Sequence, residues 1–238
     1  MLHVAERLDV VEANDENFEE RLGILEWQLL PALGYEARTP TLERRLARDP
    51  EFFVEVLSLL YRPKNSEEPR EVPEHVASSA WRLLHEWRIV PGSDERLAEI
   101  DEVHLGDWLA RAQELLDAAD RKAIGEIHIG HVFSHSREDQ DQTWPSRPVR
   151  DAIERLASSE IEDGLATQIY NNRGVTSRGL LEGGAQERDL VNYYRRKAEL
   201  IRDGWPRTAA VLMSVAAGYE SDARRNDAES ERWREGLA

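Results

Sequence analysis

Residues 159–174 read SEIEDGLATQIYNNRG, and this stretch contains the clearest helix signals in the chain. Ser159 and Glu162 form the Ser-x-x-Glu pattern of a capping box, which satisfies backbone N–H groups at the start of a helix. The apolar residues that follow repeat every four positions: Ile161, Leu165 and Ile169. Gly174 comes after the last repeat, where glycine readily adopts the left-handed conformation that ends a helix. The stretch therefore predicts a helix over about 160–172.

Three more helices are indicated around this one. A helix entered through Trp144-Pro145 precedes it, a long helix ending near Gly204 follows it, and Trp205-Pro206 begins a fourth with proline in its favoured first position. Their apolar faces consist of Val149, Ile153 and Leu156 in the first, Leu190, Tyr193, Tyr194, Leu200 and Ile201 in the second, and Leu212, Val215 and Tyr219 in the third. Four helices in series predict stacked antiparallel pairs.

The first half of the chain has helical patterns as well. Asn14 or Asp15 caps one helix, and Asp49-Pro50 combines a cap with a first-turn proline ahead of a helix over 51–61. The residues expected to face inward in these two helices are Phe18, Leu22, Leu25, Leu29 and Leu30, then Phe52, Phe53, Val56, Leu57, Leu59 and Leu60. Because the second set covers so much of its helix, we expect 51–61 to anchor this half.

Further helices are predicted over 73–87, 103–118 and 123–133, and four tryptophans among leucines are expected in the core: Trp27, Trp81, Trp87 and Trp108. The fold class predicted is all-α, built from antiparallel helix pairs. These pairs recur about every 35 to 45 residues, which fits either an irregular bundle or a short helical-repeat (HEAT-like) array. The polar loop 134–143 is the candidate boundary between subdomains 1–135 and 144–238, and one continuous domain is the alternative.

Composition narrows the classes of partner and chemistry. The chain has 238 residues and a formal net charge of -16, so it repels nucleic acid and anionic membranes at long range and both are disfavoured as partners. It has no cysteine, which excludes disulfides, thiolate metal sites and cysteine nucleophiles. The first residues lack the apolar core of a signal peptide, and no window is apolar enough for a membrane span, so a cytoplasmic protein is expected.

The connection from Asn171 to Gly184 is the first candidate site. It offers polar and basic side chains that could bind a partner or an anion: Asn171, Asn172, Arg173, Arg178 and Arg188. Gly183-Gly184 precedes a helix whose N-terminal amides could accept a phosphate or a carboxylate. Glu182 and Glu187 lie among these arginines and could pair with them. A protein-docking surface, a small-anion site and a structural loop held by internal ion pairs therefore remain three alternatives.

The second candidate is a row of imidazoles. His128, His131 and His135 are spaced by three and four residues, which places them on one helical face, and Glu126 or Asp139 could add an oxygen ligand. Such a row could bind zinc or another divalent metal, the only cofactor that the sequence suggests. The alternative is a partly solvated polar face. No catalytic residue is assigned, because the chain has no phosphate loop, dinucleotide fingerprint or nucleophile elbow.

Three segments resemble a family of proteins: LARDPEFF at 46–53, YRPK at 61–64 and YNNRGV at 170–175. In these segments, and over most of its length, the chain resembles the C-terminal helical region of large, mostly uncharacterised multidomain bacterial proteins. A role in phage defence is suspected for some of them. The resemblance implies an interaction or sensing segment, without catalytic residues to carry over.

The sequence therefore favours a non-enzymatic, helical interaction, scaffold or sensing domain that binds a protein partner or a second copy of itself. A metal-binding protein or metalloenzyme centred on the three histidines is the alternative from another class. A sensor of small anions at the 171–184 connection is the third hypothesis.

Overall fold

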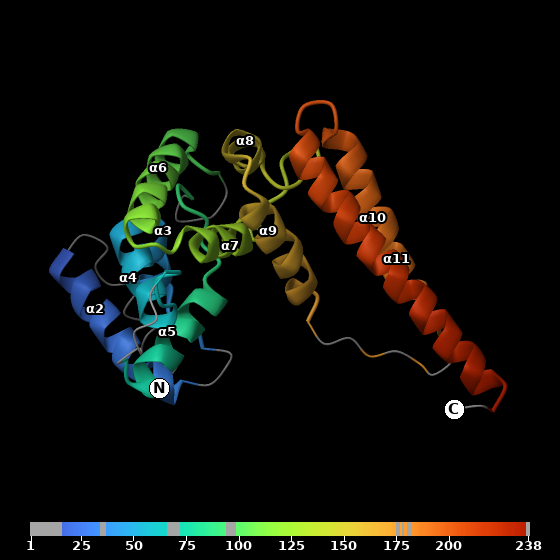
Figure 1. Ribbon diagram of the computed structural model, residues 1–238, viewed down its shortest axis with the longest axis horizontal. Coiled ribbons are helices and arrows are strands. Elements are labelled where there is room, and N and C mark those ends of the chain that lie inside the picture. The colour runs from blue at the N-terminus through green and yellow to red at the C-terminus, as the bar shows by residue number, and fades with distance from the viewer. Residues whose placement is uncertain are drawn as a thin grey trace. The chain divides into compact units, whose positions relative to one another are not determined.

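The computed structural model describes residues 16–33, 37–65, 72–93, 99–174, 177, 179 and 182–236 (Figure 1). Within these ranges it contains ten α-helices, one 3-10 helix and no strand, and Ser93 and Ile100 form an isolated bridge. The all-α prediction is confirmed. The helices are α2 (Glu16–Leu29), η1 (Leu30–Ala32), α3 (Pro40–Arg48), α4 (Pro50–Leu60), α5 (Glu74–Glu86), α6 (Glu102–Ala118), α7 (Lys122–Phe133), α8 (Arg147–Leu156), α9 (Ser159–Asn172), α10 (Ala185–Ile201) and α11 (Pro206–Arg234).

The chain divides into two compact units, Met1–Gly125 and Glu126–Ala238. The division falls within α7, so the loop 134–143 belongs to the second unit. Whether each unit is an independent domain stays a prediction. No helix in the described ranges is long and apolar enough to cross a membrane.

Helix α4 is the centre of the first unit, since it packs against α3, α5 and α6. Its Phe53 is fully buried and lies 5.4 Å, between ring centroids, from both Trp87 and Trp108. The indole Nε1 of Trp108 donates a hydrogen bond to the carbonyl oxygen of Leu46, at 3.2 Å, whereas the buried Nε1 of Trp87 has no hydrogen-bond acceptor among the described residues. The prediction that this helix anchors the first half of the chain is confirmed.

The starts of α3 and α4 are capped in different ways. Asp49 caps α4 locally, because its carboxylate accepts the backbone N–H of Phe52 at 2.9 Å, as the Asp49-Pro50 pattern predicts. Helix α3 has no local side-chain cap. Instead, the buried carboxylate of Glu26, from α2, accepts the backbone N–H groups of Thr41 and Leu42 at 3.2 and 2.9 Å. Helix α2 thus completes the hydrogen bonding of α3.

Two expectations about burial in the first unit are wrong. Leu25 and Leu29 are about half exposed, because the buried face of α2 is narrow. That face consists of Leu22 and Glu26 and continues at the same spacing to Leu30, the first residue of η1. Trp81 is 50% exposed and stacks on the ring of His85, with 4.7 Å between ring centroids, instead of packing in the core.

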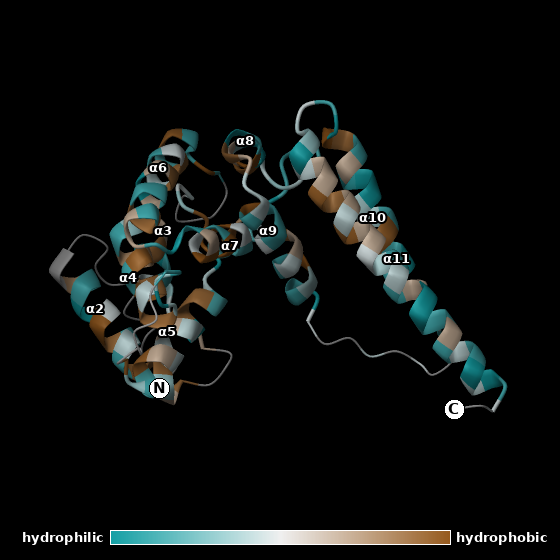
Figure 2. Cartoon of the chain, in the orientation of Figure 1, coloured by the Kyte–Doolittle hydropathy of each residue, from teal (hydrophilic) through white to brown (hydrophobic). Residues whose placement is uncertain are grey.

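In the second unit, α11 packs against α8, α9 and α10, and Figure 1 shows α10 and α11 as a long pair of neighbouring helices. The predicted apolar face of α11, Leu212, Val215 and Tyr219, is buried. Beyond it, Figure 2 shows the C-terminal end of α11 as mostly hydrophilic. The predicted face of α10 is partly wrong, because Tyr193 and Leu200 are exposed. Its buried apolar residues are Val191, Ala198 and Ile201.

The start of α9 lies one residue from the predicted capping box. Ser158, and not Ser159, is the cap, since its hydroxyl oxygen accepts the backbone N–H of Ile161 at 3.3 Å. The predicted end is confirmed, because the helix stops at Asn172 and Gly174 has a φ of +64°.

Helices α7 and α9 approach each other through two glycines. A Cβ atom added to Gly164 would lie 2.2 Å from the carbonyl oxygen of Ile127. A Cβ added to Gly130 would lie 2.2 Å from the carbonyl oxygen of Ile161. Both distances are far inside van der Waals contact, so neither position tolerates a side chain unless the helices move apart.

Candidate functional site

At the predicted site 171–184, Arg173 forms an ion pair with a residue of the same unit, Glu187. Arg173 donates a hydrogen bond to the carboxylate of Glu187 at 2.7 Å, and its guanidinium lies 5.5 Å from the ring centroid of Tyr219. Glu187 is only 4% exposed. Burial opposes the ionisation of Glu187, but hydrogen bonds from Arg173 and Asn226 outweigh it, so its pKa lies below the ordinary value. The charge of Arg173 is thus neutralised inside the second unit.

The N-terminus of α10 binds an anion, as its glycines suggest, but the anion is a carboxylate of the same chain. Asp227, on α11, accepts the backbone N–H of Gly184 at 2.8 Å and pairs with Arg188 at 2.6 Å. Both contacts lower the pKa of Asp227, the Gly184 contact most. Added Cβ atoms on Gly183 and Gly184 would lie 2.6 Å from Asp227 and 2.4 Å from the carbonyl oxygen of Ala223, so both glycines permit a close approach to α11.

The remaining residues of this predicted site have separate partners. The side-chain amide of Asn171 donates to Gln168 at 3.4 Å, and that of Asn172 donates to the hydroxyl of Ser134 at 2.9 Å. Arg178 lies outside the described residues. The four described residues of this predicted site, Asn171, Asn172, Arg173 and Arg188, therefore have different partners and do not meet around one point. Anion binding and docking at this connection stay predictions.

The predicted imidazole row is brought together only in part. The rings of His128 and His131 meet edge to face with 5.2 Å between centroids, and His135 follows the end of α7 in a turn. The predicted oxygen donors are engaged, since Glu126 accepts the hydroxyl of Ser158 and Asp139 binds Arg150. Among the described residues, no group of three or more such side chains is arranged to hold a metal. Metal binding stays a prediction.

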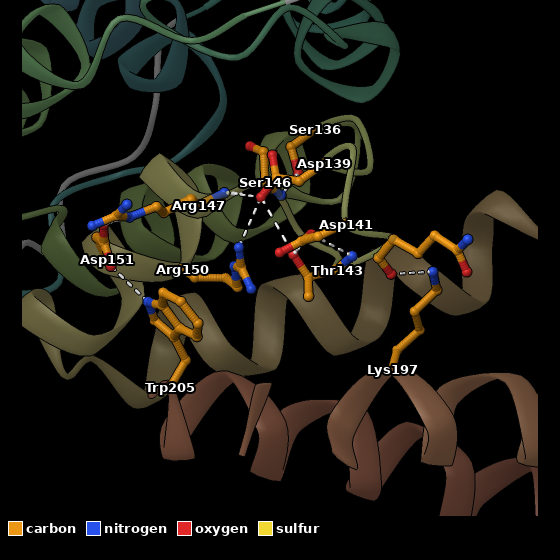
Figure 3. Close-up of polar contacts among 11 residues, drawn as sticks. Ser136, Asp139, Asp141, Thr143, Ser146, Arg147, Arg150, Asp151, Lys197 and Trp205 are labelled. Atoms are coloured by element: carbon orange, nitrogen blue, oxygen red, sulfur yellow. Dashed lines mark hydrogen bonds and ion pairs between the residues drawn. The ribbon is translucent and has the colours of Figure 1, made fainter. Parts of the chain in front are cut away.

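A polar cluster around Arg150, which sequence reasoning missed, lies in the same unit (Figure 3). Arg150 is 2% exposed, donates a hydrogen bond to Asp139 at 2.7 Å and lies 3.9 Å from the ring centroid of Trp205. Trp205 donates in turn to Asp151 at 2.6 Å. Burial lowers the pKa of Arg150, and the charges of Asp139 and Asp141 oppose this shift.

The same cluster holds the loop 134–143 in place. Lys197, which projects from α10 (Figure 3), donates to the backbone carbonyl of Gln142 and pairs with Glu138, both at 2.6 Å. Arginine and lysine from helices thus hold a loop by its carboxylates and carbonyls. The arrangement connects the loop to α8 and α10. The sequence offered one signal, an arginine within the apolar face of α8, but not its partners.

An open groove lies in the first unit, with a volume of about 740 Å³. Its apolar lining comes from four helices, α2, α4, α5 and α6, and includes Trp27, Phe52, Val54, Val56, Leu59, Val76 and Leu115. Glu51, Glu55 and Ser58 supply its polar edge. Sequence reasoning attributed the broad apolar surface of α4 to burial alone and so missed this groove.

Compared with protein-family models, curated proteins and solved structures, the chain shows no significant match. Function is therefore inferred from the geometry of the chain.

Proposed function

We propose that the chain is a non-enzymatic helical domain that binds a protein partner, with the groove of the first unit as its docking surface. The observation that carries this proposal is the groove's lining, which is apolar on four helices and open to solvent. Hydrophobic grooves formed between helices are recurrent docking sites for segments of partner proteins. Trp27 and Phe52 fit this role, since aromatic side chains are enriched at the centres of protein interfaces.

The ionisable clusters of the second unit support a non-enzymatic role. Arg150 binds Asp139, Arg173 binds Glu187 and Arg188 binds Asp227, so these charged groups have partners within the unit. Each pair joins different segments of the chain. We therefore assign a structural role to Arg173 and Arg188, and we place docking in the first unit instead of at 171–184.

A groove substitution with a matched control tests the proposal. Leu59→Ser removes an apolar contact from the groove, whereas Leu25→Ser changes a half-exposed leucine of α2 that does not line it. We expect the amount of partner protein that co-purifies with the Leu59→Ser chain to be at least tenfold lower than with the unmodified chain, as quantified by mass spectrometry. Leu25→Ser should retain it. Equal retention by both variants would contradict docking at the groove.

Elemental analysis of the purified chain tests the competing metal hypothesis. A stoichiometric divalent metal that is lost in His131→Ala, with thermal stability unchanged, would overturn the non-enzymatic proposal in favour of the imidazole row.

A further inference from the structure

We infer that the groove of the first unit binds an amphipathic helix of a partner protein whose apolar face is flanked by lysine or arginine. This inference rests on the proposed function and specifies the partner. It is carried by the spacing of the lining residues on α4 and by the charge of the first unit.

The spacing favours a helical partner. Phe52 and Leu59 line the groove at positions i and i+7 of α4, with the buried Val56 beneath them at i+4, so one face of this helix forms the groove over about 10 Å. Val76 and Leu115 extend the apolar lining onto α5 and α6. A helix placed in such a groove presents its own apolar side chains at the same spacing, which is a recurrent mode of peptide recognition.

The charge favours a basic partner. Glu51 and Glu55 line the groove and are exposed. Arg111 pairs with Glu51 at 2.7 Å and therefore offsets only part of this charge. The first unit contains 27 acidic and 15 basic residues, so it carries a formal charge of -12 out of the -16 of the whole chain. A field of this sign accelerates association with a positively charged helix and opposes an acidic one.

The same argument disfavours two other occupants. Residues 1–15 have an apolar spacing of Val4, Leu8 and Val11, but they contain four acidic residues and a single arginine. A second copy of the chain brings a net charge of -16. Both would bring negative charge to a negatively charged groove.

Two synthetic peptides of about 18 residues test the inference on the full chain. Both have leucine at the same i, i+4, i+7 positions, and one has lysine and the other glutamate at the flanking positions. By fluorescence anisotropy at low salt, we expect the lysine peptide to bind at least tenfold tighter than the glutamate peptide. This advantage should shrink at about 0.5 M salt, because salt screens exposed charges.

Substitutions then locate the binding site. Leu59→Ser should weaken the lysine peptide about tenfold, and Leu25→Ser should not change its affinity. Glu55→Lys should weaken it about fivefold. Asp107→Lys makes the same change in net charge on an exposed residue of α6 that does not line the groove, so it should have a much smaller effect. Thermal melting of each variant checks that the fold is retained.

The outcomes separate this inference from the proposed function. If both peptides bind equally and Leu59→Ser weakens both, the groove binds helices and only the basic partner is wrong. If the lysine peptide binds only after Leu8→Asp, the groove belongs to the chain's own N-terminal segment and the inference is overturned. If Leu59→Ser disrupts a dimer in sedimentation velocity, the occupant is a second copy. If no peptide binds, or if Leu59→Ser has no effect on binding, helix docking at the groove is wrong as well.

Discussion

Two buried carboxylates, one in each unit, have opposite electrostatic environments. Glu26 in the first unit is 7% exposed and accepts the backbone N–H groups of Thr41 and Leu42. Glu187 in the second unit is 4% exposed and accepts a hydrogen bond from Arg173. Burial raises the pKa of Glu26 above its ordinary value, and the amide contacts only partly offset this. The pKa of Glu187 is lowered in spite of burial.

The difference shows how burial is balanced against the partners of these two carboxylates, whereas at Glu43 burial raises the pKa in spite of hydrogen bonds from Arg38. The N-terminus of a helix supplies amide dipoles, which amount to about half of an elementary charge. A guanidinium supplies a full charge and a directed hydrogen bond. The first arrangement leaves Glu26 with a net cost for ionisation, and the second removes that cost for Glu187.

The largest effect on the free energy of unfolding is expected when Arg173 is removed. Arg173→Leu leaves Glu187 buried without its counter-charge, so we expect the free energy of unfolding to fall by about 3 kcal/mol, measured by urea denaturation. The double variant Arg173→Leu with Glu187→Leu should recover most of this loss, because no uncompensated charge remains. Equal losses in the single and double variants would show that the pair acts by packing alone.

Removing the carboxylate of Glu26 should have a somewhat smaller effect. Glu26→Ala leaves the backbone N–H groups of Thr41 and Leu42 without their acceptor and removes the cap of α3, so we expect a loss of about 2 kcal/mol. Glu20→Ala, at an exposed position of α2, serves as the control and should change stability by less than about 0.5 kcal/mol. A small effect at Glu26 would mean that water replaces the carboxylate.

The contributions of Glu26 and Glu187 to stability should depend on pH in opposite directions. Because the folded pKa of Glu26 is raised, its contribution to stability falls as pH rises from 4.5 through the folded value, and Glu26→Gln should be more destabilising near pH 4.5 than at pH 7. Because the folded pKa of Glu187 is lowered, its contribution is present above 4.5 and is lost as pH falls through the lowered value.

Glu187→Gln should therefore cost most at neutral pH and least in acid. Urea denaturation of the unmodified chain and both variants at several pH values between about 3 and 7 measures this. Parallel pH profiles for the two variants would contradict the assigned environments.

The smallest effect is expected at Asp227, which combines both kinds of partner at an exposed position. Its side chain is 40% exposed, so Asp227→Asn should lower the free energy of unfolding less than Arg173→Leu or Glu26→Ala does. The loss should decrease at high salt, where the attraction of Arg188 is screened. Thermal melting at two ionic strengths checks this, and a loss independent of salt would assign the effect to the Gly184 hydrogen bond alone.

Local patterns explain which parts of the fold could be predicted. Asp49 caps α4 because its acceptor and the N–H of Phe52 are three residues apart, a spacing that sequence shows directly. Glu26 caps α3 over a separation of fifteen and sixteen residues, which only the packing of α2 determines. Leu25 is exposed for the same reason, because the choice of buried face on α2 depends on its neighbours.

The sequence predicted which residue types occur at the candidate sites, but not which residues contact each other there. The alternative of a loop held by internal ion pairs correctly placed a carboxylate, Glu187, among the arginines. It could not identify Asp227 as the anion at the N-terminus of α10, since that residue lies about forty positions away on α11. The groove was missed because apolar periodicity does not distinguish a helix face buried in the core from one that lines an open groove.

The contact of α7 and α9 limits which substitutions this chain can accept. Gly130 and Gly164 are thirty-four residues apart, and each faces a backbone carbonyl of the opposite helix at a distance that excludes any side chain. A chain with the same helix crossing must keep both residues free of Cβ atoms, whatever else has diverged. Both positions are therefore constrained by backbone atoms of the neighbouring helix, which cannot repack as a side chain can.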